Sequence, residues 1–258
     1  MNWSNIELAI LAPAFCAGLL VLATHVPLGA QVLRKGIVFI DLAIAQIAAL
    51  GVIGAGMMDL DPTGWQVQAA AAAAAVAGAL LLAWTEKKWP EVQEAQIGVL
   101  FVLAATAGIL LLAKNPHGGE HLRDLLAGQI LWVSYRQLAL PLFAALVTLG
   151  LLWVSRERLS RLGFYLLFAL AVTVSVQLVG VYLVFATLIV PALGVRRHPE
   201  TRRLRLAYAI GVAGYAIGLL LSSALDLPSG ALIVWCLALI AIAAHSMAPR
   251  ETLKAGAV

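Results

Sequence analysis

Residues 163–195 read GFYLLFALAVTVSVQLVGVYLVFATLIVPALGV, a stretch of 33 residues without a charged side chain. A helix needs about 20 apolar residues to cross the hydrocarbon core of a bilayer, so this stretch is long for one crossing and short for two. Arg161 precedes it and Arg196 follows it. Because Lys and Arg gather on one side of a membrane, both ends are expected on the same side. The stretch is therefore predicted to cross twice, as two short or partly re-entrant helices that divide near Gln177.

The whole chain is strongly apolar. Of its 258 residues, 62% are hydrophobic and 12% are charged, and the mean hydropathy is +0.96. Soluble domains carry about 25% charged residues, so this composition excludes a soluble protein. It predicts an all-α polytopic membrane protein, with a single transmembrane domain over residues 1–258 and about 8–9 transmembrane helices in a compact bundle. Besides the two helices within 163–195, the expected spans are 6–32, 37–58, 66–84, 96–113, 138–154, 204–222 and 231–247.

The basic residues predict the orientation of these helices. With this number of crossings, all but three of the 17 Lys and Arg residues fall on one side, and Lys114, Arg123 and Arg136 fall on the other. Because Lys and Arg are concentrated in cytoplasmic loops, the amino terminus is expected outside and the carboxy terminus in the cytoplasm, in the plasma (inner) membrane of a bacterium. The excess of basic residues is then an orientation signal and a contact with anionic lipid headgroups. It does not indicate a nucleic-acid partner.

One carboxylate, Asp41, lies inside an expected span. A buried carboxylate costs several kcal/mol unless it is paired, protonated or open to water, so an intramembrane acid suggests a functional site. Three interpretations remain open: a contact with a transported substrate, an ion pair with Lys35 about 9 Å away along the helix, and a hydrogen bond between packed helices. Gln46 follows five residues later, roughly 140° around the same helix, so the two side chains need not face one cavity.

The histidines suggest a second kind of site. The segment KNPHGGEH (114–121) contains H-x-x-E-H, the order in which a helix of a zinc protease presents two ligands and a general base. A proline and two glycines argue against a helix here. The segment is instead interpreted as an external loop, either an ordinary solvated loop or one that captures metal through His117, Glu120 and His121. His25, in the first span, is either a packed histidine or a ligand along a substrate pathway.

The sequence contains no GxxxxGK[ST] loop, so it lacks the usual cradle of backbone amides for ATP phosphates. An ATP-driven transporter would therefore need its ATPase on another chain. The alternative is a secondary transporter or channel for cations that does not use ATP. Such a protein usually carries more than one deep ionisable residue, whereas Asp41 stands nearly alone.

Five segments resemble one family in their order along the chain. They are LGAQVLRKGIVFIDLAIAQIAALG (28–51), IGVLFVLAATAGILLL (97–112), LLAGQILWVS (125–134), VGVYLVFATLIVPA (179–192) and LDLPSGALIV (225–234). They are similar to the permease subunits of ABC importers for zinc, manganese or iron, of the zinc-uptake permease type, and this match extends over nearly the whole chain.

This resemblance implies a function and partners. The chain would be a transport subunit and not an enzyme, and would pass a divalent metal cation by alternating access, zinc first, with manganese or iron as the other options. It would hold no permanent cofactor. The implied partners are an ABC ATPase subunit, a periplasmic or lipid-anchored metal-binding protein, a second permease copy and membrane lipid.

Two departures from the family pattern affect the site residues. Family members commonly carry an acid followed four residues later by His in the second helix. An ungapped alignment on Gly51 places Gln46 at the His position and Leu42 at the acid position, with Asp41 one residue early. The metal pathway is therefore expected to use Asp41, Gln46 and His25 for transient passage. Loss of the His also removes the ligand that favours zinc, which leaves the metal open.

The second departure concerns the segment VSRERLSRLGFY (154–165), where the family carries a short coupling helix that contacts the ATPase. This chain is several residues shorter there. Arg156, Glu157, Arg158 and Arg161 are the candidate docking residues, although a basic cytoplasmic loop does not require a partner to explain it.

Overall fold

The structure is a computed structural model that describes residues 8–58, 64–112, 126, 128–155 and 160–248. Within these residues all regular structure is helical. The helices are α1 (Leu8–Lys35), α2 (Ile40–Gly56), α3 (Trp65–Lys88), η2 (Pro90–Val92), α4 (Gln93–Leu112), η3 (Ile130–Trp132), η4 (Tyr135–Leu138), α6 (Ala139–Ser155), α7 (Arg161–Val179), α8 (Val181–Gly194), α9 (Glu200–Leu225) and α10 (Ser229–Ser246).

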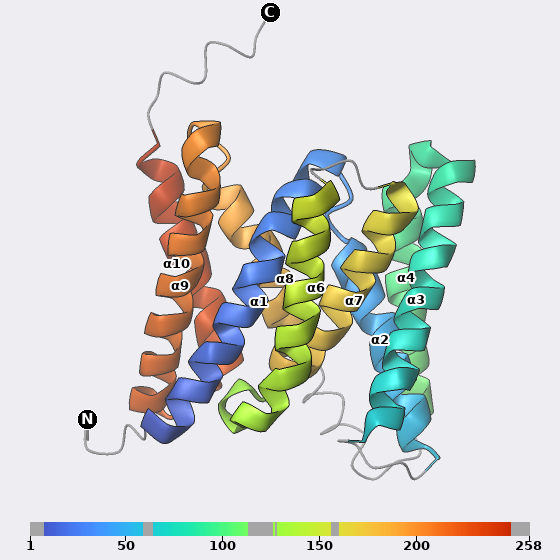
Figure 1. The fold of residues 1–258 in the computed structure, drawn as a ribbon, viewed down its shortest axis with the longest axis horizontal. Helices are drawn as coiled ribbons and strands as arrows, with labels where there is room; N and C mark the ends of the chain where they lie inside the picture. The colour runs from blue at the N-terminus through green and yellow to red at the C-terminus, as the bar shows by residue number, and fades with distance from the viewer. Residues whose placement is uncertain (1–7, 59–63, 113–125, 127, 156–159, 249–258) are drawn as a thin grey trace, which may run out of the picture.

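The helices run side by side between two ends of one bundle (Figure 1). Seven are long and apolar enough to cross a membrane, and α2 and α8 are shorter apolar helices. The predicted all-α bundle of about eight or nine spans is therefore confirmed. The helices α2, α3 and α4 pack together on one side, α9 and α10 pack on the other, and α1, α6, α7 and α8 lie between them.

The described Lys and Arg residues collect at one end of the bundle, which we call the basic end. It is the upper end in Figure 1, where α1, α3 and α8 finish and α7 and α9 begin. The basic end carries Arg34, Lys35, Lys87, Lys88, Arg161, Arg196, Arg197, Arg202, Arg203 and Arg205. Among the described residues, only Arg136 on η4 lies at the opposite end. The sequence predicts that successive spans alternate in direction, and this alternation accounts for the collection of basic residues at one end.

The stretch 163–195 forms two helices that divide near Gln177, as predicted, with the break itself at Gly180. Gly180 adopts a φ of 82°, which favours glycine because it has no Cβ. The break stays within the apolar run, so α8 has only 14 residues. In Figure 1 the turn between α7 and α8 lies inside the bundle, short of the outer ends of α1 and α9.

Small residues allow close contact between helix backbones. A Cβ at Gly29 of α1 would overlap the backbone carbonyl of Leu188 on α8, and a Cβ at Gly51 of α2 would lie 2.5 Å from the carbonyl oxygen of Ala70 on α3. In lipid, such close packing replaces the hydrophobic effect as the main force between helices. These contacts fix α1 against α8 and α2 against α3, and so position the polar residues on α1 and α2.

Candidate cation pathway

Asp41 lies in the first turn of α2 and is 1% exposed. One of its carboxylate oxygens accepts a hydrogen bond from the backbone N–H of Leu42 at 2.9 Å. The positive end of the helix dipole favours a carboxylate at this position. No ion pair to Asp41 is found among the described residues, and Lys35 instead places its Nζ 5.0 Å from the centre of the Phe164 ring. Asp41 is therefore stabilised by the start of its own helix, through the Leu42 N–H and the helix dipole, and not by a basic side chain among the described residues.

Gln46 lies five residues further along α2 and is 6% exposed. It lines a small cavity between α2, α4 and the start of α8. The other lining residues are Ala49, Leu50, Ile53, Ala104, Gly108, Leu126 and Val181. The Gln46 amide makes no hydrogen bond within the described part of the chain, so its oxygen remains available inside an otherwise apolar cavity. Asp41 does not line this cavity, in agreement with the angle expected between the two side chains.

His25 lies in α1 and is fully buried. Its Nδ1 lies 2.9 Å from Thr24 Oγ1 and 3.0 Å from the carbonyl oxygen of Val21. Because a carbonyl only accepts, Nδ1 is assigned the proton, which leaves a lone pair on Nε2. Nε2 is buried and has no partner among the described residues.

Asp41, Gln46 and His25 do not form one cluster. On α1, Leu22 lies three residues before His25 and packs on Gly211 of α9. Gly29 lies four residues after His25 and packs on α8. Gln46 faces α4 and the start of α8. In the described residues, no group of three or more His, Cys, Asp or Glu side chains could hold a metal ion. The geometry thus offers separate polar positions along the bundle, which suits brief contacts with a cation better than a dehydrated multi-ligand site.

Other predicted site residues are only partly described. His117, Glu120 and His121 of the external loop lie outside the described residues, and so do Arg156, Glu157 and Arg158. Arg161 is the first residue of α7, and its Nη1 lies 3.3 Å from Oε1 of Glu86 on α3. The Arg161 side chain is 67% exposed, so this pair contributes at most about 1 kcal/mol.

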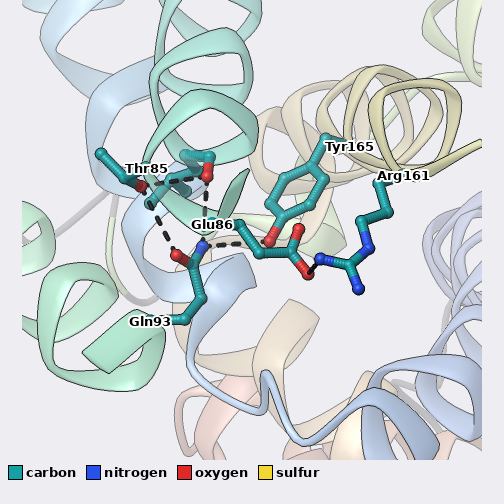
Figure 2. A network of polar contacts seen from close by, with 6 residues as sticks. Thr85, Glu86, Gln93, Arg161 and Tyr165 are labelled. Atoms are coloured by element: carbon teal, nitrogen blue, oxygen red, sulfur yellow. Dashed lines mark hydrogen bonds and ion pairs between the residues drawn. The ribbon is translucent and has the colours of Figure 1, made fainter. Parts of the chain in front are cut away.

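A polar network at the basic end was not predicted from the sequence (Figure 2). Gln93, the first residue of α4, donates from Nε2 to the carbonyl oxygen of Leu82 at 3.2 Å and to the hydroxyl oxygen of Tyr165 at 3.1 Å. The Thr85 hydroxyl donates to the Leu82 carbonyl at 3.0 Å and approaches Gln93 Oε1 at 3.5 Å. Figure 2 shows the Glu86 carboxylate beside the Tyr165 hydroxyl. The network joins the end of α3, the start of α4 and the start of α7.

This network is buried, so its hydrogen bonds are costly to lose. Gln93 is 5% exposed and Tyr165 is 1% exposed. Loss of one partner of a buried hydrogen bond leaves a desolvated polar group and costs about 1–3 kcal/mol. The only signal in the sequence was a pair of polar residues, Gln93 and Glu94, at the start of an apolar span. Polar residues are common at span ends, and nothing in the sequence identifies Tyr165 as their partner.

Comparison with known proteins identifies the family. The model of the ABC 3 transport family matches residues 7–164 and 156–248, which together cover most of the chain. The chain belongs to the ABC 3 transport family. This confirms the family predicted from the five segments, the permease subunits of ABC importers for metals, and with it the prediction of a transport subunit that is not itself an enzyme.

Individual relatives of this ABC 3 protein agree in length and fold. It is 24% identical over 265 residues to the high-affinity zinc uptake system membrane protein ZnuB of Haemophilus influenzae, covering 95% of this chain and 99% of that protein. It is 26% identical over 242 residues to the uncharacterized membrane protein slr2045 of Synechocystis, covering 86% and 84%. Its fold is similar to PsaBC of Streptococcus pneumoniae, solved with a Fab, with a TM-score of 0.77, 19% identity and coverage of 96% and 95%.

Proposed function

We propose that this ABC 3 permease carries a divalent metal cation inward across a bacterial plasma membrane, with zinc as the first candidate and manganese or iron as the others. Its similarity over nearly the full length to a zinc uptake membrane protein supports this cargo. The observation that carries the proposal is Asp41, a buried carboxylate on α2 that no basic side chain neutralises among the described residues. A passing cation would supply the missing positive charge.

The polar residues have different roles in this proposal. Asp41 lies near the basic end and attracts the cation there. Gln46 offers a neutral oxygen in the cavity between α2, α4 and α8, and His25 offers the buried Nε2 of its ring on α1. Each position supplies one protein ligand, so the cation binds weakly at each and can leave. His117, Glu120 and His121 are proposed to capture metal before it enters.

The proposed complex needs further chains. A second permease copy, an ABC ATPase and a periplasmic or lipid-anchored metal-binding protein would complete the importer. The ATPase is proposed to dock at the basic end, on Arg156, Glu157, Arg158 and Arg161, which places the carboxy terminus in the cytoplasm and the amino terminus outside. ATP binding and hydrolysis would favour one of two arrangements of the bundle over the other and so alternate access to Asp41 and Gln46.

Uptake by the reconstituted complex tests this function. The permease, the ATPase and the metal-binding protein are placed in liposomes, and zinc, manganese and iron inside the liposomes are measured by mass spectrometry. We expect one metal to accumulate against its gradient only when ATP is present. Equal metal entry without ATP and without the ATPase would favour a channel or secondary transporter, and no entry of any of the three metals would reject the proposal.

A further inference from the structure

The first turn of α4 contacts two other helix starts through adjacent residues. Gln93 donates a hydrogen bond to the hydroxyl of Tyr165, in the first turns of α7. Glu94, the next residue, accepts the backbone N–H of Val38 at 2.8 Å through Oε1. Val38 lies two residues before Ile40, where α2 begins, and three residues before Asp41. One turn of α4 therefore holds both the start of α7 and the start of α2.

The start of α2 depends on this contact. Its N-cap residue, Phe39, makes no side-chain capping bond, and Val38 has no helical partner for its N–H because it precedes the helix. Glu94 provides that acceptor from a helix 56 residues further along the chain. Asp41 lies in the first turn of the same helix. A shift of the α4 start therefore moves Val38, and with it the start of α2 that carries Asp41.

The start of α7 is fixed on several sides. Ser160 caps α7 by accepting the N–H of Gly163 at 3.1 Å. Arg161 contacts Glu86 at the end of α3, and Phe164 lies under the ammonium group of Lys35 at the end of α1. The Gln93–Tyr165 hydrogen bond, which joins α7 to α4, is buried and therefore contributes more than the Arg161–Glu86 pair, which joins α7 to α3 and is exposed at Arg161.

The position of α7 in the sequence connects these contacts with the proposed docking of the ATPase. Residues 156–159, which immediately precede Ser160, contain three of the four docking residues of the proposed function. That segment is joined through Ser160, the N-cap residue, directly to the first turn of α7. From there two hydrogen bonds on adjacent residues of α4 lead from Tyr165 to Val38, which lies three residues before Asp41 in the chain.

We propose that Gln93 and Glu94 are positioning residues that transmit movement of the α7 start to the start of α2, and so couple the ATPase to the cation pathway. This inference rests on the proposed function. Neither residue needs to touch the cation. Gln93 keeps α4 with α7 through Tyr165, and Glu94 keeps α2 with α4 through Val38, so the three helix starts move together at the basic end.

The test measures how many zinc ions are transported for each ATP hydrolysed by the complete complex in liposomes, with zinc-loaded metal-binding protein outside. Tyr165→Phe removes one hydroxyl oxygen from the link to Gln93. Glu94→Leu removes the acceptor for the Val38 N–H, and Glu94→Gln retains an acceptor oxygen without the charge. Tyr208→Phe is the matched control, since it also removes a hydroxyl that bonds between helices, from Tyr208 on α9 to the Ala23 carbonyl at 3.0 Å.

We expect Tyr165→Phe and Glu94→Leu to bind the ATPase and hydrolyse ATP like the wild type, while zinc transported per ATP falls at least about fivefold, the lower end of typical allosteric coupling. Glu94→Gln and Tyr208→Phe are expected to keep the wild-type ratio. An unchanged ratio in both Tyr165→Phe and Glu94→Leu would overturn the inference and leave the proposed function in place. A proportional fall in hydrolysis and transport would also overturn it, because a purely structural role gives that result. A wild-type complex that does not accumulate zinc, manganese or iron would reject the proposed function and the inference with it.

Discussion

Gly128 lies directly against the carbonyl oxygen of Val179, at the point where α7 ends and Gly180 turns the chain into α8. Gly128 has a φ of +69° and no room for a side chain, because a Cβ would overlap that carbonyl group. Gly128→Ala should therefore destabilise the bundle by more than the about 1–2 kcal/mol that left-handed backbone costs a residue with a Cβ. The midpoint of thermal unfolding of the purified permease measures this.

Gly36 is the control for that substitution. It has a φ of +71°, nearly the same as Gly128, but apart from its own chain neighbours no described residue comes within 4 Å of a Cβ built on it. Gly36→Ala should cost only the backbone term of about 1–2 kcal/mol. Equal loss of stability in the two variants would show that the contact between Gly128 and Val179 adds nothing to the stability of the α7–α8 turn.

Part of this turn could be predicted from the sequence and part could not. The length of 163–195 and the arginines on both sides predict two crossings, because charge is expensive in hydrocarbon. The position of the break depends on which residue tolerates a positive φ, and Gly180 alone in this part of the run satisfies that condition. Its contact with Gly128 depends on packing between segments far apart in the chain, which no local pattern records.

The same distinction applies to the candidate pathway. Burial of Asp41 and Gln46 follows from their positions inside an apolar span, and their different faces follow from helical geometry. The Glu94–Val38 and Gln93–Tyr165 contacts join residues 56 and 72 positions apart, so no local pattern in the sequence pairs them. The helix α9 contains the expected span 204–222 but begins earlier, at Glu200, because charged residues at the basic end continue the helix beyond the apolar run.

Asp41→Asn should abolish metal uptake without disturbing the structure. The amide oxygen can still accept the Leu42 N–H, which the carboxylate accepts at 2.9 Å, but the variant lacks the charge that attracts a cation. Asp41→Ala should also abolish uptake, with membrane insertion intact. The measurement is uptake by the reconstituted complex, normalised to the amount of permease inserted. Undiminished uptake in Asp41→Asn would assign Asp41 to helix capping alone.

Gln46→His should change which metal is preferred. The substitution places an imidazole in the cavity between α2, α4 and α8, and imidazole favours zinc more strongly than an amide oxygen does. We expect a higher share of zinc when zinc, manganese and iron compete for uptake, measured together by mass spectrometry. Gln46→Leu, which removes the oxygen at similar volume, is the matched control and should reduce total metal uptake without raising the share of zinc. An identical metal ratio in the wild type and Gln46→His would remove Gln46 from the pathway.

Replacing Arg156, Arg158 and Arg161 with Glu should reduce recovery of the ATPase with the affinity-purified permease, because the proposed docking segment would change from basic to acidic. Only a small part of this effect can come from the loss of the Arg161–Glu86 pair, which is exposed at Arg161 and contributes at most about 1 kcal/mol. The matched control replaces Arg202, Arg203 and Arg205 with Glu, which makes the same change of charge at the basic end but on α9. We expect the control to retain the ATPase. Equal losses in both variants would mean that the ATPase responds to the total charge of the basic end, whereas full recovery in the first variant would place docking outside residues 156–161.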